Sequence, residues 1–551
     1  MANKYQKNWT ATWGILIILI LSSSCERTCQ HTTQSIQTQL SETIQSENAF
    51  QIVDYLSDRW RLRGGGNRGY DESLDYVRDF LKNSGFEAAG HLEVLEGPLT
   101  LRPLAWEVNE ASISIVSPEQ RQLHTYEDTP TLLGRYSGST QEDGVTAELV
   151  DVGAGDRPED YRNKNVRGKI VLGRSRASDL IQQAVMSRGA LGVVSDRLAN
   201  QAYYDKFPDM VLHEPVPFGD PEEMKTSGLW LIKISPETGA TLRDLLAQGA
   251  VRLNIKTKTR FFDSIQRTLI AEIAGKKAPQ QRIVLVAHLD NIKPGANNNA
   301  SGIGTHAELA RTLSSLIQQG SITRPSRTIT FLFCAEREGS RQWLNSIGDE
   351  VKEILVMINA DMTGENTDLT GGIYRLEKSP EPTMHVERAA KYVPVEDRLS
   401  GYIFRPIDID PYPGHFLNDF AWNLIETYAE EMNWTVKRHP FEGGSDHDVF
   451  LPLRIPSILS WHWVDYFIST NLDTPDKVSG EEMKKVGVVH GMAALRLAAG
   501  TESDALELVH VVESNALLRL KNESAIAQTV LEDHQDQEGE ESFEVLYERQ
   551  M

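Results

Sequence analysis

The hydrophobic and polar positions of the chain follow two different periods. From about residue 49 to 86 apolar residues recur every three or four positions, as in AFQIVDYLSDRW and ESLDYVRDFLKNSGF, which predicts two helices. From about 130 to 258 short runs such as VTAELVDVG and GKIVLGR predict strands, with a helix at DLIQQAVMSRGA. We therefore expect a helical N-terminal part, 47–129, followed by a small β-rich domain, 130–258.

The following segment has three strongly apolar runs, RIVLVAHLD, RTITFLFCAE and EILVMINAD. Helical patterns separate them, of which SGIGTHAELARTLSSLI is the clearest. Strands that alternate with helices predict a parallel sheet covered on both faces. The expected fold class is α/β, with a mixed, mostly parallel sheet between helices and the β-rich domain inserted into it. Residues 259–500 complete the main domain, with further helices at GHFLNDFAWNLIETYAE and EEMKKVGVVHGMAALRLAAG and a loop at GGIYRLEKSPEPT.

The two ends of the chain have a different composition. Two lysines precede the apolar run WGILIILIL and the sequence SSSC, which ends at Cys25. A basic start and an apolar run too short to span a bilayer predict a secretory signal over 1–25, followed by a polar tether over 26–46. The signal resembles that of bacterial lipoproteins, in which the cysteine is lipidated, although Leu21 lies four residues before Cys25 instead of three. In the mature protein, lipid on Cys25 would be the only membrane attachment. Simple secretion and an uncleaved N-terminal anchor are the alternatives. Residues 501–551 predict one or two short helices and an acidic, solvated run, EDHQDQEGEE.

Charge and cysteine content limit the classes of partner and of fold that the sequence allows. The formal net charge of -22 argues against nucleic acid as a partner, because phosphate binding needs clustered lysine and arginine. The 551 residues exceed the length of one typical domain, and three cysteines cannot supply a disulfide framework. Cys334 lies in an apolar strand, where we expect a buried small hydrophobe.

Polar side chains follow each of the three apolar strands. His288 and Asp290 end the first, Glu336 follows the second and Asp361 follows the third. Ligands of open α/β sheets bind just beyond the carboxyl ends of the strands. We therefore expect one histidine and several carboxylates to converge at one edge of the sheet.

Six motifs give this edge a family resemblance. HLD, GANNNASG, AEREG, NADMTG, GGSDHDVF and STNLDTPDKV occur in the order seen in the zinc aminopeptidases of metallopeptidase family 28, which also includes the transferrin receptor. The β-rich segment, from TAELVDVG to RGALGVVS, resembles a protease-associated domain. Together the two resemblances cover most of residues 47–500. They imply a zinc-exopeptidase-like fold, hydrolysis of N-terminal residues of peptides, and two zinc ions bridged by a carboxylate.

The resemblance assigns a role to each motif residue. His288 and Asp361 match the two ligands that belong to the first metal alone, and Asp290 matches the carboxylate that orients such a histidine. Glu336 matches the general base. Asn298 stands where the family has its bridging aspartate.

The two ligands that belong to the second metal alone are both replaced. Arg337 stands at the family's glutamate and Ser469 at its histidine. An amide oxygen such as that of Asn298 binds zinc more weakly than a carboxylate, and a guanidinium repels a dication. We expect one zinc ion at most, held by His288, Asp361 and Asn298, or none. Asp446 and His447, in GGSDHDVF, are expected to be pocket residues.

Two hypotheses stay open. The protein is either a modified metallo-aminopeptidase that uses Glu336 and at most one zinc, or a non-catalytic peptide-binding pseudopeptidase in which Arg337 is a fixed positive charge. His447 or His462 could supply a further ligand in the first case. A glutaminyl-cyclase-like transferase fits poorly, because the three replaced residues are the ligands that such enzymes keep. The sequence leaves the oligomeric state unknown.

Overall fold

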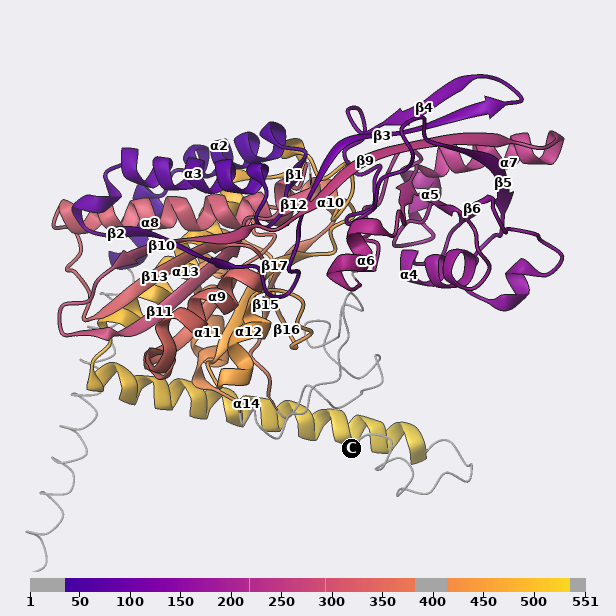
Figure 1. The fold of residues 1–551 in the computed structure, drawn as a ribbon. Coiled ribbons are helices and arrows are strands. Elements are labelled where there is room, and N and C mark those ends of the chain that lie inside the picture. The colour runs from indigo at the N-terminus through magenta and orange to yellow at the C-terminus, as the bar shows by residue number, and fades with distance from the viewer. Residues whose placement is uncertain (1–34, 218, 293, 382–413, 536–551) are drawn as a thin grey trace, which may run out of the picture.

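The computed structural model describes residues 35–217, 219–292, 294–381 and 414–535. The predicted signal, Cys25 and the acidic run at 536–551 lie outside the described residues. The described chain forms two lobes, each built on its own sheet (Figure 1). None of its helices is long and apolar enough to cross a membrane.

The larger lobe is built on an eight-stranded mixed sheet. Its strand order is β16 (Val436–His439), β15 (Ile373–Glu377), β17 (Ser457–Trp463), β14 (Ile354–Ala360), β11 (Ala278–His288), β13 (Arg327–Cys334), β10 (Ile265–Ile273) and β2 (His91–Pro98). The four central strands, β17, β14, β11 and β13, are parallel. On one side β10 and β2 join antiparallel, and on the other β15 pairs antiparallel with β17 and parallel with β16. This is the predicted mixed, mostly parallel sheet, and its four parallel strands end at one edge.

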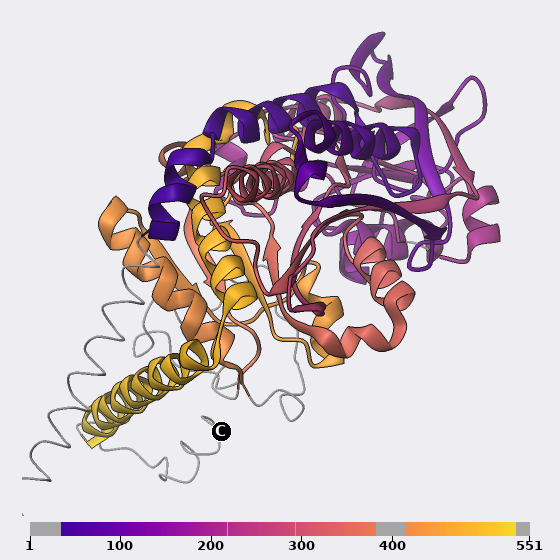
Figure 2. The same ribbon diagram turned by 90° about the vertical axis from the view of Figure 1, so that its left-hand side faces the viewer.

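Helices bury both faces of the sheet, as Figure 2 shows. One face packs against α2 (Ser46–Arg59), α3 (Arg68–Asn83), α8 (Gly302–Gln318), α11 (Phe416–Met432) and α13 (Gly480–Ala499). The other packs against α9 (Glu338–Ile347) and α12 (His447–Phe450). Successive residues of β11 show why its sequence is apolar throughout: Ile283 and Leu285 join the first core, whereas Val284 and Val286 join the second.

The smaller lobe is an insertion between β2 and β10. Its seven-stranded sheet has the order β4 (Arg121–Thr125), β3 (Ala105–Ser117), β9 (Arg252–Phe262), β5 (Val145–Asp151), β6 (Ile170–Gly173), β7 (Gly192–Ser195) and β8 (Leu231–Lys233). Its helices are α4 (Ala177–Leu180), α5 (Tyr203–Lys206), α6 (Pro221–Thr226) and α7 (Pro236–Gln248). The long strands β3 and β9 pair antiparallel and carry the chain out from the main domain and back (Figure 1).

Some predicted boundaries differ from the structure. The inserted sheet begins at Ala105 instead of 130, because the alternating sequence AWEVNEASISIVS forms β3 inside the expected helical part. Residues 35–43 are helical and Leu40 is fully buried, so the expected tether is already folded there.

Two further segments were assigned wrongly. The expected loop at GGIYRLEKSPEPT contains β15, whose Tyr374 and Leu376 are buried against the helices. The C-terminal region forms one long helix, α14 (Glu502–Gln535), instead of short ones. No glycine or proline interrupts the sequence of α14, so nothing in it ends the helix early.

Candidate functional site

The parallel strands bring the predicted residues together. His288 ends β11, Glu336 and Arg337 follow β13, and Asp361 follows β14. His288 Nε2 lies 3.4 Å from Asp361 Oδ2. His288, Glu336 and Asp361 line one wall of a cavity of about 230 Å³ between the two lobes, and Arg135, Tyr136 and His213 of the inserted domain line the opposite wall.

Asp290 connects the ends of β11 and β13. Its Oδ1 atom accepts a hydrogen bond of 2.7 Å from the Glu336 backbone N–H and lies 3.6 Å from His288 Nδ1. Burial opposes a charge on His288, but Asp361 and Asp290 outweigh it and raise the pKa of the imidazole well above its usual value. His288 Nδ1 hydrogen-bonds the Asp290 backbone carbonyl at 3.2 Å, whereas the Asp290 carboxylate, which was expected to orient the imidazole, lies beyond hydrogen-bond distance and acts on it through charge.

The Glu336 carboxylate points into the cleft. Enclosure by the protein raises its pKa to about 7, with a further contribution from Asp290 and Asp446, while His288 and Arg337 oppose the shift. A carboxyl group with a pKa near neutrality can accept or donate a proton at physiological pH.

Arg337 occupies a network of acids. Its Nη2 atom lies 3.3 Å from Glu336 Oε1 and 3.5 Å from Asp448 Oδ2, and its backbone N–H donates to Asp446 Oδ1 at 2.8 Å. Arg337 also has a φ of 61°, a backbone conformation that costs a non-glycine residue energy unless its surroundings fix it. The guanidinium is therefore held in place by charge and by main-chain contacts.

Asn298 and Ser469 take part in other contacts. The Asn298 side-chain oxygen accepts from Asn291 Nδ2 at 3.2 Å, and its backbone N–H donates to Asp473 Oδ2 at 3.2 Å. The Ser469 carbonyl accepts from the His213 backbone N–H at 2.7 Å. Ser469 thus meets the inserted domain through its main chain.

Asp446 and His447 are buried next to the cleft. Asp446 Oδ1 accepts from Ser340 Oγ at 2.6 Å, which fixes the first turn of α9. His447 Nε2 lies 3.0 Å from Glu377 Oε1, and burial, which lowers its pKa, is outweighed by Glu377 and Asp448, which raise it. His462 contacts the Met362 carbonyl and Glu482 instead of the cavity.

Glu377 was missed in the sequence because its segment was expected to be a loop. It ends β15, is 1% exposed and lines the cavity, where it also accepts from the backbone N–H groups of Glu442 and Gly443 at 3.0 and 2.9 Å. Arg102, Arg135, Tyr136 and His213 were missed as well, because they lie outside the strand-end motifs. A tyrosine with a φ of 68° is unusual, but a backbone angle cannot be seen in a sequence.

The side chains do not fit the pair of zinc ions that the resemblance implies. Catalytic zinc usually has three protein ligands from histidine, cysteine or carboxylate side chains. Within the four described ranges, no three such side chains are grouped to hold a metal ion. The position of the second metal's glutamate holds a guanidinium, and Asn298 offers only an amide at the bridging position.

Comparison with known proteins identifies the family to which the main domain is similar. The model of peptidase family M28 matches residues 268–493, which include every strand-end residue of the cleft. Residues 268–493 belong to peptidase family M28. A probable lipoprotein aminopeptidase, LpqL of Mycobacterium tuberculosis, is 26% identical to this M28 chain over 72% of the chain and 68% of the relative. An aminopeptidase of Pseudomonas aeruginosa is 25% identical over 59% of each protein.

Solved structures agree on the fold. An M28 peptidase precursor from Shewanella amazonensis superimposes with a TM-score of 0.60 and 17% identity, covering 86% of this chain and 98% of the other. The zinc aminopeptidase BSAP of Bacillus subtilis gives a TM-score of 0.56 and 18% identity, covering 84% and 97%. Because both coverages extend beyond the matched family region, the M28 chain shares the overall α/β architecture of these proteins.

Proposed function

We propose that this M28 chain binds peptides in the cleft between its two domains and does not hydrolyse them with a pair of zinc ions. The observation that carries the proposal is the ion pair of Arg337 with Glu336 and Asp448 at the position of the second metal's ligand. A guanidinium there supplies positive charge beside the carboxylates without activating a water molecule. The cavity still offers charged groups of both signs to a peptide.

The proposal includes the location of the protein. Export and lipidation at Cys25 are supported by the signal pattern of residues 1–25 and by the similarity to a relative named as a probable lipoprotein. The inserted domain corresponds in sequence pattern to a protease-associated domain. We propose that it forms one wall of the peptide site.

A second candidate is a modified aminopeptidase. It is favoured by the retained pair His288 and Asp361 beside the Glu336 carboxylate, and by relatives that are named as aminopeptidases. In that case a single zinc would be held by His288, Asp361 and Asn298, and Glu336 would move the proton.

Calorimetric titration of the purified protein with tripeptides, combined with mass spectrometry of the peptides after incubation, separates the two candidates. We expect binding that survives chelator treatment, with every peptide recovered intact. Arg337→Gln is expected to weaken peptide binding roughly tenfold. Without the guanidinium, Glu336 and Asp448 lose their counter-charge, and the cleft loses the positive charge that it offers to a peptide. Arg341→Gln, an exposed arginine one turn along α9, is the matched control. Chelator-sensitive release of N-terminal residues would contradict the proposal and support the aminopeptidase.

A further inference from the structure

Beyond peptide binding, on which this inference rests, we propose that the cleft recognises the C-terminal residue of its peptide. The structure assigns the terminal carboxylate to Arg102 and Arg135, and an aliphatic side chain of the same residue to a leucine-lined pocket beside them. The ligand class is therefore a peptide that ends in an aliphatic residue with a free carboxylate.

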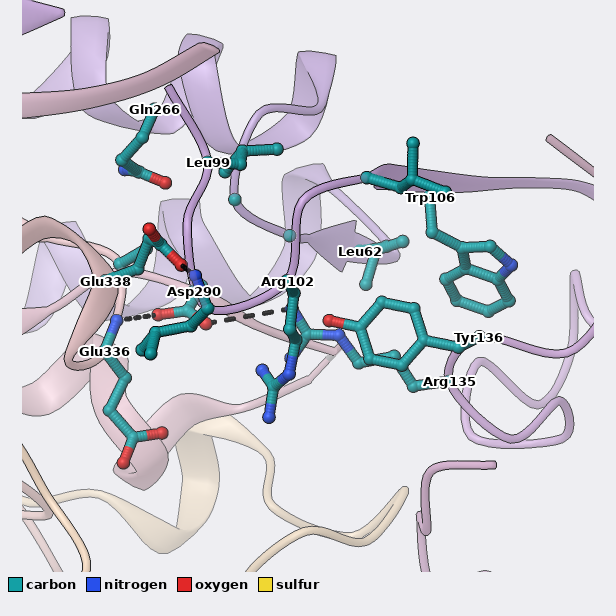
Figure 3. A pocket seen from close by; sticks show the side chains of 15 residues that line it. Leu62, Leu99, Arg102, Trp106, Arg135, Tyr136, Gln266, Asp290, Glu336 and Glu338 are labelled. Carbon is teal, nitrogen blue, oxygen red and sulfur yellow. Dashed lines mark hydrogen bonds and ion pairs between the residues drawn. The ribbon is translucent and has the colours of Figure 1, made fainter. Parts of the chain in front are cut away.

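The two arginines come from different parts of the chain and face the same space. Arg102 lies on the loop between β2 and β3, and Arg135 lies on the inserted domain. Their guanidinium carbons lie 5.5 and 5.1 Å from the centre of the Tyr136 ring, close enough for cation–π attraction. Figure 3 shows Arg102 between Tyr136 and the Asp290–Glu336 pair.

The positive charge of the Arg102 and Arg135 guanidinium groups is only partly neutralised by neighbouring carboxylates. Arg135 Nη2 lies 3.8 Å from Asp290 Oδ2, a contact too long for a hydrogen bond. Arg102 makes no ion pair with any carboxylate among the residues that the structure describes. Two guanidinium groups and one carboxylate, that of Asp290 beside Arg135, leave about one positive charge for a ligand. A monoanionic carboxylate matches this charge. A phosphate dianion exceeds it and would be repelled by the carboxylates of Asp290 and Glu336.

Glu338 fixes the loop that carries Arg102. The Glu338 carboxylate is 6% exposed and accepts three hydrogen bonds from that loop: from Thr100 N and Oγ1, both at 2.6 Å, and from Leu101 N at 2.7 Å. Because Glu338 begins α9, directly after Glu336 and Arg337, the loop is tied to the strand end that forms the cleft. Glu338 is therefore a positioning residue for Arg102.

A small apolar pocket adjoins the arginines. It has a volume of about 40 Å³ and shares Arg102, Arg135, Tyr136, Asp290 and Glu336 with the main cavity. Its other lining side chains are mostly apolar: Leu62, Leu99, Leu101, Leu104 and Trp106. One water-sized group needs roughly 10–15 Å³ of such volume, so the pocket has room for about three, the size of a short aliphatic side chain.

The test compares Ala-Ala-Val with a free carboxylate and the same peptide as its C-terminal amide, by calorimetric titration of the full-length protein. We expect the free acid to bind roughly 10- to 100-fold more tightly, as a lost charge-assisted hydrogen-bond pair predicts. Arg102→Gln should reduce this ratio towards one, because it weakens binding of the free acid far more than binding of the amide. Arg121→Gln, an exposed arginine on β4 away from the cleft, should keep the ratio.

Glu338→Gln provides an independent check of the positioning role. It keeps the side-chain shape and should lower the acid-to-amide ratio without changing the affinity for the amide. Equal binding of acid and amide by the unmodified protein would overturn the carboxylate assignment and leave peptide binding in place. Binding of neither peptide, nor of any other tripeptide, would overturn both proposals.

Discussion

The Arg337 guanidinium lies 3.3 Å from the carboxylate of its neighbour Glu336. In the arrangement that the family resemblance implies, Glu336 is the general base and the next residue is a metal ligand. In this protein the residue after Glu336 is Arg337, whose positive charge balances the negative charge of the Glu336 carboxylate. This pair and the substitutions at Asn298 and Ser469 change the chemistry of the cleft without changing the strands that form it.

The first prediction concerns metal content. Purified protein, dialysed against buffer without chelator, should contain well under one zinc per chain by elemental analysis. The triple variant Asn298→Asp/Arg337→Glu/Ser469→His restores the family's bridging carboxylate and both ligands of the second metal. It should bind zinc, because it removes a repulsive guanidinium and adds three donors.

The double variant Asn298→Asp/Arg337→Glu, which lacks the histidine, is the matched control and should bind zinc more weakly than the triple variant. One or two zinc ions per chain in the unmodified protein would contradict the prediction.

The second prediction concerns pH and Glu365, which lies in the turn after β14. Glu365 is fully buried, and its carboxyl group has only weak contacts with Thr370 and the Gly372 backbone N–H to offset the cost of burial. Burial, with a further contribution from Asp465, raises its pKa from 4.5 to about 9. A group whose folded pKa is raised stabilises the fold fully below its unfolded pKa, and this stability is lost as the pH rises towards the folded value.

Glu365→Gln removes this titration. Between about pH 4.5 and 9 the unmodified protein should lose up to about 1.4 kcal/mol of unfolding free energy per pH unit relative to the variant. The variant should thus gain stability over the unmodified protein as the pH rises from 5 to 8. Urea unfolding at several pH values measures the difference, and parallel pH profiles of the two proteins would show that Glu365 is ionised in the fold.

The strand ends of the cleft could be predicted from the sequence, whereas its other wall could not. His288, Glu336 and Asp361 follow apolar runs that are long enough to be recognised as buried strands, and parallel strands end at one edge. Arg102 and Arg135 come from a loop and from the inserted domain. Their position depends on tertiary contacts such as that of Glu338 with Leu101, which no local period reveals.

Glu377 illustrates a different limit. β15 has only five residues and lies next to the edge strand of the sheet, between GG and a proline-containing segment that resembles a loop. Short strands near a sheet edge are set by pairing with neighbours, here β17 and β16, more than by their own sequence.

The third prediction concerns Arg63, whose guanidinium is fully buried in the main domain. It donates to the carbonyl groups of Leu289 at 3.1 Å and Gly295 at 3.3 Å, and so joins the end of β11 to the loop that contains Asn298. Replacement by methionine leaves these buried carbonyl groups unpaired. Arg63→Met should lower the free energy of unfolding by about 3 kcal/mol.

Arg68→Met is the matched control for Arg63. Arg68 is 73% exposed and pairs with Glu72 on the surface of α3, so its replacement should cost less than about 1 kcal/mol. Thermal and urea unfolding of both variants give the comparison. Equal stability of the two variants would mean that water replaces the Arg63 contacts.

The last prediction concerns the contact between the two domains at Asn471. Its side-chain oxygen accepts from the Val211 backbone N–H at 2.6 Å, and its own backbone N–H donates to the Val211 carbonyl at 3.2 Å. Leu212 and Thr470 form an antiparallel bridge beside it. These bonds hold the segment that contains His213 against the segment that contains Ser469, and thereby set the width of the cleft. Asn471→Ala removes the side-chain bond and retains the main-chain one.

Hydrogen exchange measured by mass spectrometry should therefore become faster around Val211 in Asn471→Ala, by roughly five- to tenfold for a bond that contributes about 1 kcal/mol. Exchange in β11 should be unchanged, because that strand belongs to a separate core. Asn471→Asp keeps the acceptor for Val211 and is expected to show a smaller effect. Faster exchange throughout the chain would instead indicate global destabilisation, and unchanged exchange at Val211 would show that the main-chain bridge alone holds the domains together.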